Sequence, residues 1–321
     1  MRAFSARAVG SYQRLICPLR QILPSGTVES ILYTVIRLVM NREKKPLPGR
    51  LNGVLLAMGY FAIARLGLLL ATVNPLTSPI WPATGLAIAF LAARGRIYWP
   101  AIWIGAFAAN FSTGVPIGAT AMISTGNTLE ALIGAMIFER TNRRSENLFG
   151  AEKFVGTIVA SFFATPVSAT FGTAALFLSA TIARGDLGST WLTWWTGDTL
   201  GNLLFAPLFL NLLTDKKYFS GRPFRLTSVL ALAIGVSTFL FFREAGALYR
   251  VFLIYPVLLL ATYLLRPIEV GIVSLAIGAI SIASVVAGRG PFHLASTNED
   301  LILIAIFLGS IAITEQILRF V

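Results

Sequence analysis

Long apolar segments alternate with short stretches of glycine, proline and charged residues along most of the chain. The first uninterrupted apolar segment runs from Leu51 to Val73, and its strongly polar side chains are Asn52 and Arg65. Further apolar segments follow at about 80–93, 98–112, 115–138, 154–181, 189–213, 226–242, 248–265, 267–287 and 301–320. Because a membrane-crossing helix needs about 20 apolar residues, the pattern predicts an all-α polytopic bundle of about eight to ten transmembrane helices.

The first 50 residues differ from the rest, and we expect them to form a basic tail. The first 26 residues contain no acid, and their basic residues are Arg2, Arg7, Arg14 and Arg20. The segment 28–40 is apolar but short and contains Glu29 and Arg37, which favours a helix on the membrane surface over a span. We therefore expect a tail over residues 1–50 and an integral membrane domain over residues 51–321.

The distribution of lysine and arginine among the loops predicts the orientation of the bundle. One set of alternate loops contains few basic residues, namely Arg184, Arg243, Arg250 and Arg289. The other lysines and arginines from Arg37 onward fall in the second set, apart from Arg65 inside the first span. Since basic loops stay on the cytoplasmic side, an even number of spans predicts that both termini are cytoplasmic. The tryptophans that would then lie at the outer interface, as an aromatic belt, are Trp81, Trp191, Trp194 and Trp195.

The composition excludes several classes of protein. Of 321 residues, 56% are hydrophobic and 12% are charged, and the mean hydropathy is +0.76, whereas soluble domains have about 25% charged residues. The net charge of +12 is spread over the loops, so nucleic acid is not an expected partner and the lipid bilayer is. Cys17 and His293 are the only cysteine and histidine, which excludes disulfides within the chain. With no Cys/His set for a metal or haem, we expect no cofactor.

Polar side chains inside the apolar segments are the candidate functional residues, because an unpaired charge costs about 3 kcal/mol or more there. The ionisable ones are Arg65, Glu130 and Asp198, and an Arg65–Asp198 pair fits their expected depths. Trp191, Trp195, Asp198 and Asn202 follow the spacing i, i+4, i+7 and i+11, which places them on one helical face. We expect an outward-opening, ligand-binding pocket whose other lining residues are Trp81, Thr84, Asn110 and Asn127.

The same residues also fit a purely structural role. A buried Arg–Asp pair with amide neighbours can hold helices together, as can Glu130 with Asn127, and tryptophans can simply anchor helices at the interface. His293, in the outer loop 288–300, could sense pH or could be a solvated loop residue. The sequence leaves these alternatives open.

Three longer motifs carry a resemblance to a known family. They are Ile80-Trp-Pro-Ala-Thr-Gly-Leu-Ala, Gly126-Asn-Thr-Leu-Glu-Ala-Leu-Ile-Gly and Ser189-Thr-Trp-Leu-Thr-Trp-Trp-Thr-Gly-Asp-Thr-Leu-Gly. The chain resembles the type 1 membrane-associated sensor domain, and shorter matches such as Pro166-Val-Ser-Ala-Thr-Phe-Gly and Arg289-Gly-Pro-Phe extend the resemblance over about residues 55–320. The resemblance implies a sensory input domain of the bacterial inner membrane that precedes a diguanylate cyclase, a cyclic-di-GMP phosphodiesterase or a histidine kinase.

The resemblance leads us to expect a sensor that binds a small ligand or a partner protein and passes the signal to a cytoplasmic output. The chain has neither a Gly-Gly-Asp-Glu-Phe loop nor the core of a cyclic-di-GMP phosphodiesterase. We therefore expect a separate output partner, a diguanylate cyclase or histidine kinase, or a longer protein of which this is the sensor; a homodimer is a possible assembly. The competing hypothesis is a transporter or permease subunit, since transporters also use broken helices and intramembrane charge. An intramembrane enzyme with Glu130 and Asp198 as acid and base would lack a nucleophile or metal set, so no enzyme activity is expected.

Overall fold

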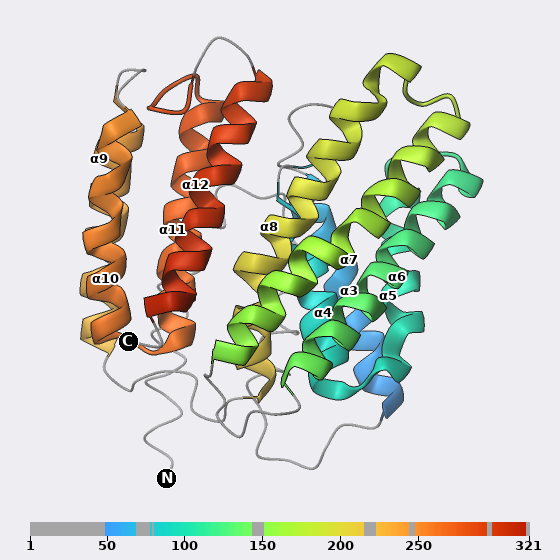
Figure 1. Ribbon diagram of the computed structural model, residues 1–321, viewed down its shortest axis with the longest axis horizontal. Coiled ribbons are helices and arrows are strands. Elements are labelled where there is room, and N and C mark those ends of the chain that lie inside the picture. The colour runs from blue at the N-terminus through green and yellow to red at the C-terminus, as the bar shows by residue number, and fades with distance from the viewer. Residues whose placement is uncertain are drawn as a thin grey trace, which may run out of the picture. The chain divides into compact units, whose positions relative to one another are not determined.

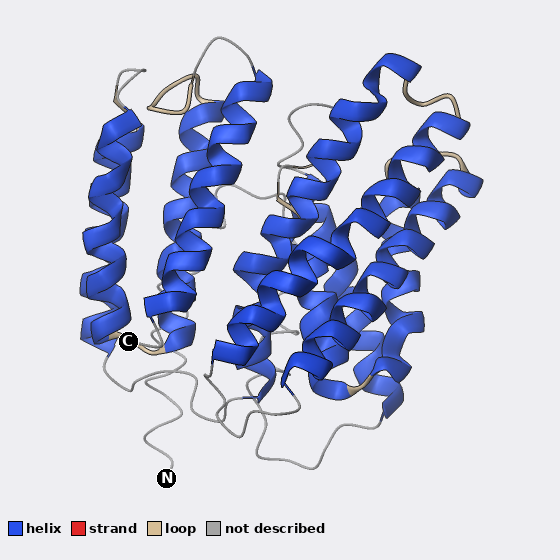
Figure 2. Ribbon diagram, in the orientation of Figure 1, coloured by secondary structure: helices blue, strands red, loops and turns tan. Residues whose placement is uncertain are grey.

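The computed structural model describes residues 49–68, 78, 80–142, 151–214, 223–243, 248–293 and 297–318. The chain divides into two units, Met1–Pro46 and Leu47–Val321, and every described residue belongs to the second. The described residues form helices joined by turns and short 3-10 segments, with no strand among them (Figure 2). The α-helices are α3 (Gly49–Leu68), α4 (Pro82–Arg94), α5 (Trp99–Phe111), α6 (Ile117–Asn142), α7 (Ala151–Leu178), α8 (Leu187–Thr214), α9 (Pro223–Phe241), α10 (Ile254–Leu264), α11 (Pro267–Val286) and α12 (Thr297–Leu318) (Figure 1).

The helices in the described part of the chain confirm the expected all-α bundle, because each overlaps one of the predicted apolar segments. Five are long and apolar enough to cross a membrane, namely α3, α9, α11 and the segments Ile117–Thr141 of α6 and Val155–Leu178 of α7. The chain is therefore a multi-pass membrane protein. The surface helix expected over residues 28–40 lies outside the described residues.

Helix α8 contacts two groups of helices. On one side α4 and α7 pack along α8, α6 packs along α7, and α5 packs between α3 and α6. On the other side α9, α10, α11 and α12 pack against one another, and both α11 and α12 contact α8. The apolar core of this second group includes Leu200, Leu203 and Leu204 of α8. A change in the position of α8 would therefore alter the packing of both groups of helices.

Consecutive helices alternate in direction, so α12 ends at the end of the bundle at which α3 begins (Figure 1). We call this the inner end, and it is the end predicted to be cytoplasmic. An ion pair at the inner end joins Arg96 Nε, between α4 and α5, to Glu139 Oε2 of α6 at 3.6 Å. The orientation across the membrane stays a prediction from the charge distribution.

Helix α4 begins inside the bundle. The backbone N–H of Trp81, just before α4, donates to the Gly197 carbonyl oxygen of α8 at 2.9 Å. Gly197 lies about 15 Å along α8 from Leu187, at 1.5 Å per residue. Glycines permit this approach, because a Cβ on Gly201 would collide with the Trp81 carbonyl group and one on Gly85 would lie 2.6 Å from the Gly201 carbonyl oxygen. The N-terminus of α4 is therefore packed against α8 well away from the start of that helix, and α8 satisfies part of its backbone, as a bilayer would require.

Candidate functional site

Asp198 of α8 lies beside the buried start of α4. Its side chain is fully buried, and Thr84 Oγ1 donates to Asp198 Oδ1 at 3.0 Å. Thr84 is the third residue of α4, so the carboxyl group lies next to the first turn, where the helix dipole and the free backbone N–H groups favour negative charge. The early start of α4 thus gives a physical reason for an acid at this depth.

Glu130 of α6 faces the same region. It lies one turn from both Gly126 and Gly134, and a Cβ on either glycine would collide with a neighbouring helix: Phe171 of α7 for Gly126 and Ile88 of α4 for Gly134. This face of α6 is therefore packed against α4 and α7, and Glu130 is only 1% exposed. Because α4 and α6 run in the same direction, Glu130 lies one turn above the Ile88 contact. That is the level of Thr84.

Two hydrogen bonds join α6, α7 and α8 at this level. Trp194 Nε1 donates to Ser168 Oγ at 3.1 Å, and Ser168 Oγ donates to Asn127 Oδ1 at 2.6 Å. Trp194 precedes Asp198 by one turn, and Asn127 precedes Glu130 by nearly one turn, so these bonds bring the two acids together. Their carboxyl groups are close enough to interact electrostatically. We call this set of residues the polar centre: Thr84, Asn127, Glu130, Ser168, Trp194 and Asp198.

Three atoms of the polar centre have no hydrogen-bond partner among the described residues. They are Asn127 Nδ2, Glu130 Oε1 and Asp198 Oδ2, and all three are buried. The ion pairs among the described residues involve Glu139 and Asp300, so neither acid of the polar centre has a described counter-charge. Leaving a buried polar group unpaired costs about 1–3 kcal/mol, and more when it is charged. A further hydrogen-bonding or charged partner would therefore stabilise the polar centre.

A second set of polar contacts continues along α8 toward the inner end. Asn202 Nδ2 donates to Ser161 Oγ of α7 at 2.7 Å, and the hydroxyl oxygens of Thr165 and Thr199 lie 3.0 Å apart. Asn202 therefore faces α7, and Asp198 accepts a hydrogen bond from Thr84 of α4. These contacts fix the rotation of α8 about its own axis.

The tryptophans occupy environments that differ from the expected aromatic belt. Trp81 is not exposed as a belt residue would be, because its side chain is buried and packs against Gly67 of α3, and its depth in the membrane stays a prediction. Trp191 and Trp195 stack with ring centroids 5.6 Å apart, and Trp191 Nε1 donates to Thr170 Oγ1 of α7 at 3.1 Å. The expected stripe from Trp191 to Asn202 therefore contains side chains with different neighbours, since the two indoles contact α7 and Asp198 contacts α4.

The expected pair between Arg65 and Asp198 does not form. Arg65 Nη1 donates to Ser112 Oγ at 2.9 Å, and the Arg65 side chain is exposed. Asn110 also lacks a described contact with the polar centre, because its Nδ2 donates to the Ala106 carbonyl oxygen of its own helix at 2.9 Å. The members of the polar centre are buried or half-buried, so the outward-opening pocket stays a prediction.

Two members of the polar centre, Trp194 and Ser168, and one residue beside it, Tyr60, were not among the candidate site residues predicted from the sequence. Trp194 precedes Asp198 by one turn, and Ser168 lies in the motif that begins at Pro166, so both had a signal that could have identified them. Tyr60 of α3 is 1% exposed and lies beside Trp81 and Asn127. The sequence carries no comparable signal for Tyr60, which is one of many aromatic residues in an apolar segment.

Helix α12 is joined to its neighbours by polar side chains that the sequence analysis also missed. Gln316 Nε2 donates to the Leu203 carbonyl oxygen of α8 at 3.4 Å, and Ser274 Oγ of α11 donates to Glu315 Oε2 at 2.7 Å. Leu203 follows Asp198 by five residues, which is about 7.5 Å along the helix. The polar centre and α12 therefore contact neighbouring turns of α8.

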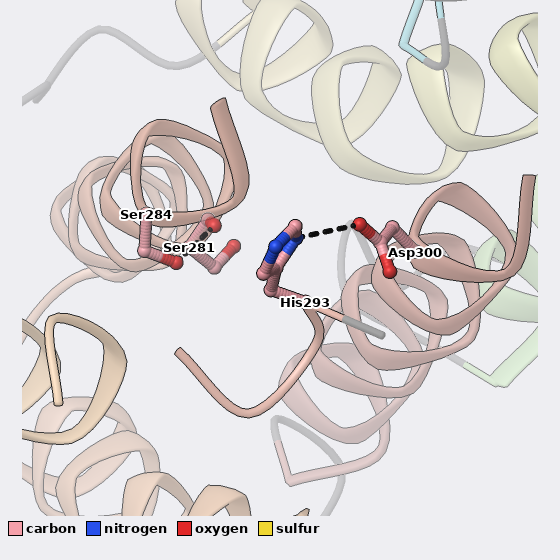
Figure 3. Close-up of polar contacts among 4 residues, drawn as sticks. All are labelled: Ser281, Ser284, His293 and Asp300. Atoms are coloured by element: carbon pink, nitrogen blue, oxygen red, sulfur yellow. Dashed lines mark hydrogen bonds and ion pairs between the residues drawn. The ribbon is translucent and has the colours of Figure 1, made fainter. Parts of the chain in front are cut away.

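The loop between α11 and α12 places His293 against the start of α12. His293 Nδ1 lies 3.1 Å from Asp300 Oδ2, and the Asp300 side chain is almost fully buried (Figure 3). Ser281 and Ser284, in the same view, donate to carbonyl oxygens of their own helix. His293 therefore contacts an acid of α12, and its pH-sensing role stays a prediction.

Comparison with known families gives one match, which is independent of this geometry. The MASE1 family, a family of membrane-associated sensor domains, matches residues 53–320. Comparisons with curated proteins and with solved structures gave no match. The MASE1 match covers most of the chain and nearly all of the helices from α3 to α12. The chain therefore belongs to the MASE1 family of membrane-associated sensor domains.

Proposed function

We propose that this membrane sensor domain receives its stimulus at the polar centre and passes the change inward through α12. The stimulus is a small ligand or the surface of a partner that reaches the polar centre from the outer side. The receiving partner is a cytoplasmic output domain or protein, a diguanylate cyclase or a histidine kinase, at the bacterial inner membrane. Membership of a sensor-domain family and the membrane-crossing helices support this proposal.

One observation carries the proposal: α8 holds both Asp198 and the carbonyl group to which α12 is bonded. Thr84 contacts Asp198 from one side of α8, and Gln316 of α12 contacts Leu203 from the other. A stimulus changes the structure only if it binds one arrangement of the helices more tightly than another. The unpaired atoms at Asp198 and Glu130 provide that difference, since a stimulus that pairs them stabilises the arrangement in which they face it.

The proposal is tested by asking whether α12 responds to a change at the polar centre. In a Cys17→Ser background, Ile317→Cys places a thiol on the last turn of α12, where the native side chain is 45% exposed. We expect Asp198→Asn to change the rate at which a maleimide modifies this thiol in native membranes. Phe224→Cys, at the inner end of α9, is the control, and its thiol should react at the same rate with and without Asp198→Asn. Equal rates at Ile317→Cys with and without Asp198→Asn would contradict the proposal.

Transport is the second candidate function, and the early start of α4 favours it. Transporters also point the N-terminus of a broken helix at a charged group near the middle of the membrane. Uptake into proteoliposomes separates the two functions. Net flux of a solute that is lost in Asp198→Asn would favour a transporter over a sensor.

A further inference from the structure

We propose that the polar centre binds a small cation, held by carboxylate oxygens of Glu130 and Asp198. This inference rests on the proposed function, because it names the class of ligand that the same site takes. The ligand chemistry is a positive charge that fits between two carboxyl groups, which both a metal ion and a primary ammonium group offer.

The first argument is the charge of the site. Glu130 and Asp198 are 1% and 0% exposed, and no described lysine, arginine or histidine pairs with either of them. The N-terminus of α4 contributes the equivalent of about half a positive charge near Asp198. Two ionised carboxyl groups would still leave more than one negative charge uncompensated in a bilayer, where such a charge is costly. A bound cation removes most of this deficit.

The second argument is the identity of the unpaired atoms. Glu130 Oε1 and Asp198 Oδ2 lack a described partner and can only accept a hydrogen bond when ionised, whereas Asn127 Nδ2 is an unpaired donor on a side chain that is 4% exposed. A proton shared between the two acids would pair the two oxygens and leave Asn127 Nδ2 unpaired. A cation held between the two carboxyl groups pairs both oxygens without a proton.

The third argument concerns the type of cation. Among the described residues, no three Asp, Glu, His or Cys side chains lie together as metal ligands. The hydroxyl groups of the site, on Thr84 and Ser168, already donate to Asp198 and Asn127. Divalent calcium takes six to eight oxygen ligands, and transition metals prefer histidine and cysteine. Two carboxylates with hydroxyl neighbours therefore suit a monovalent ion, such as sodium or an ammonium group.

The test uses the purified full chain in detergent micelles at neutral pH and follows thermal unfolding by tryptophan fluorescence. Sodium, potassium, calcium and methylammonium chlorides are titrated separately, and choline chloride keeps the ionic strength constant. A ligand that binds the folded state raises Tm progressively with its concentration. We expect such a rise with sodium, potassium or methylammonium, and the ion that acts at the lowest concentration identifies the source of the charge.

Amide variants and a matched control locate the binding site. Glu130→Gln and Asp198→Asn should each raise the ion concentration needed for a given rise in Tm by about thirtyfold or more, because each removes one of the two charges that hold the ion. Glu139→Gln changes an acid of the same helix that pairs with Arg96 outside the polar centre, and it should respond as the native chain does. In choline alone the two site variants should be at least as stable as the native chain, since each removes an uncompensated charge. Equilibrium dialysis with radioactive sodium or methylammonium measures binding to the native chain directly and should give about one ion per chain.

Three results would overturn the inference. The first is that Tm does not rise with any of the monovalent ions. The second is that Tm rises equally in the native chain and in both site variants. The third is that Tm depends on pH but not on any ion, which would indicate a shared proton. A failure of this inference is distinct from a failure of the proposed function. If no ion binds but Asp198→Asn still alters modification at Ile317→Cys, the polar centre controls α12 through another ligand.

Discussion

Gly201→Ala tests whether the start of α4 is held against α8 inside the bilayer. The substitution adds one methyl group to α8 at the point where α4 begins. That methyl group would lie 2.5 Å from the Trp81 carbonyl carbon and closer still to its oxygen, and real Cβ contacts essentially never fall below 3.0 Å. The obstacle is backbone, so a side-chain rotation does not relieve it. The start of α4 must move away from α8 by about 1 Å.

The cost follows from what this movement breaks. Overpacking costs about 1–3 kcal/mol, and separating the Trp81 N–H from the Gly197 carbonyl leaves buried groups unpaired at a further cost of about 1–3 kcal/mol. Replacing glycine by alanine inside a helix returns about 1 kcal/mol. We expect Gly201→Ala to lower the free energy of unfolding by about 3 kcal/mol.

The measurement is equilibrium unfolding of the purified chain in mixed micelles with increasing SDS. Gly235→Ala is the matched control, because Gly235 lies inside α9 and an added Cβ there has no neighbour within 4 Å. The control should be unchanged or more stable by up to about 1 kcal/mol. If the free energies of unfolding of Gly201→Ala and Gly235→Ala agree within about 0.5 kcal/mol, α4 does not begin against α8 and Asp198 does not lie beside its first turn.

Three further substitutions separate the contacts of the site. Trp194→Phe removes the indole donor to Ser168 and should lower the free energy of unfolding by about 1–2 kcal/mol in the same SDS titration, whereas no loss would mean that this bond does not join α7 to α8. Arg65→Ala should cost less than about 1 kcal/mol because its side chain is exposed and does not pair with Asp198; a loss above 3 kcal/mol would indicate a buried ion pair. Gln316→Leu should leave stability within about 1 kcal/mol but abolish the effect of Asp198→Asn on thiol modification in α12, and an undiminished effect would mean that coupling takes another route.

The sequence predicts the helices well because each is an apolar segment ended by glycine, proline or charge. It also identifies Glu130 and Asp198, since acids inside such segments are costly. It does not predict that α4 begins against Gly197, because a hydropathy pattern gives the length of a segment and not the depth at which its helix starts. The burial of Trp81 is not predicted for the same reason. Its position depends on the close contact between two helices that only a three-dimensional structure defines.

The contacts within the site show a second limit of sequence analysis. Helical spacing places Trp191, Trp195, Asp198 and Asn202 on one broad face, but it does not predict that Thr84 of α4 reaches Asp198 on that face while Trp191 and Asn202 bond to α7. Expected depth suggested Arg65 as a partner of Asp198, but depth does not specify which side of a helix a residue occupies. Gln316 lies in a segment whose apolar pattern predicts a helix but gives no signal for its contact with α8.

The most direct test of the central claim is the distance between α12 and α3, a helix that does not pack along α12 or α8. The distance between spin labels at Ile317 of α12 and Arg50 of α3 is measured by double electron–electron resonance in a Cys17→Ser background. One labelled chain keeps Glu130 and Asp198, and the other carries Glu130→Gln and Asp198→Asn together. The account predicts that the distance distribution shifts by about 1–2 Å or more when the polar centre loses its charges, which is the scale of helix shifts in switching proteins. Superimposable distributions would contradict the claim that the polar centre controls α12.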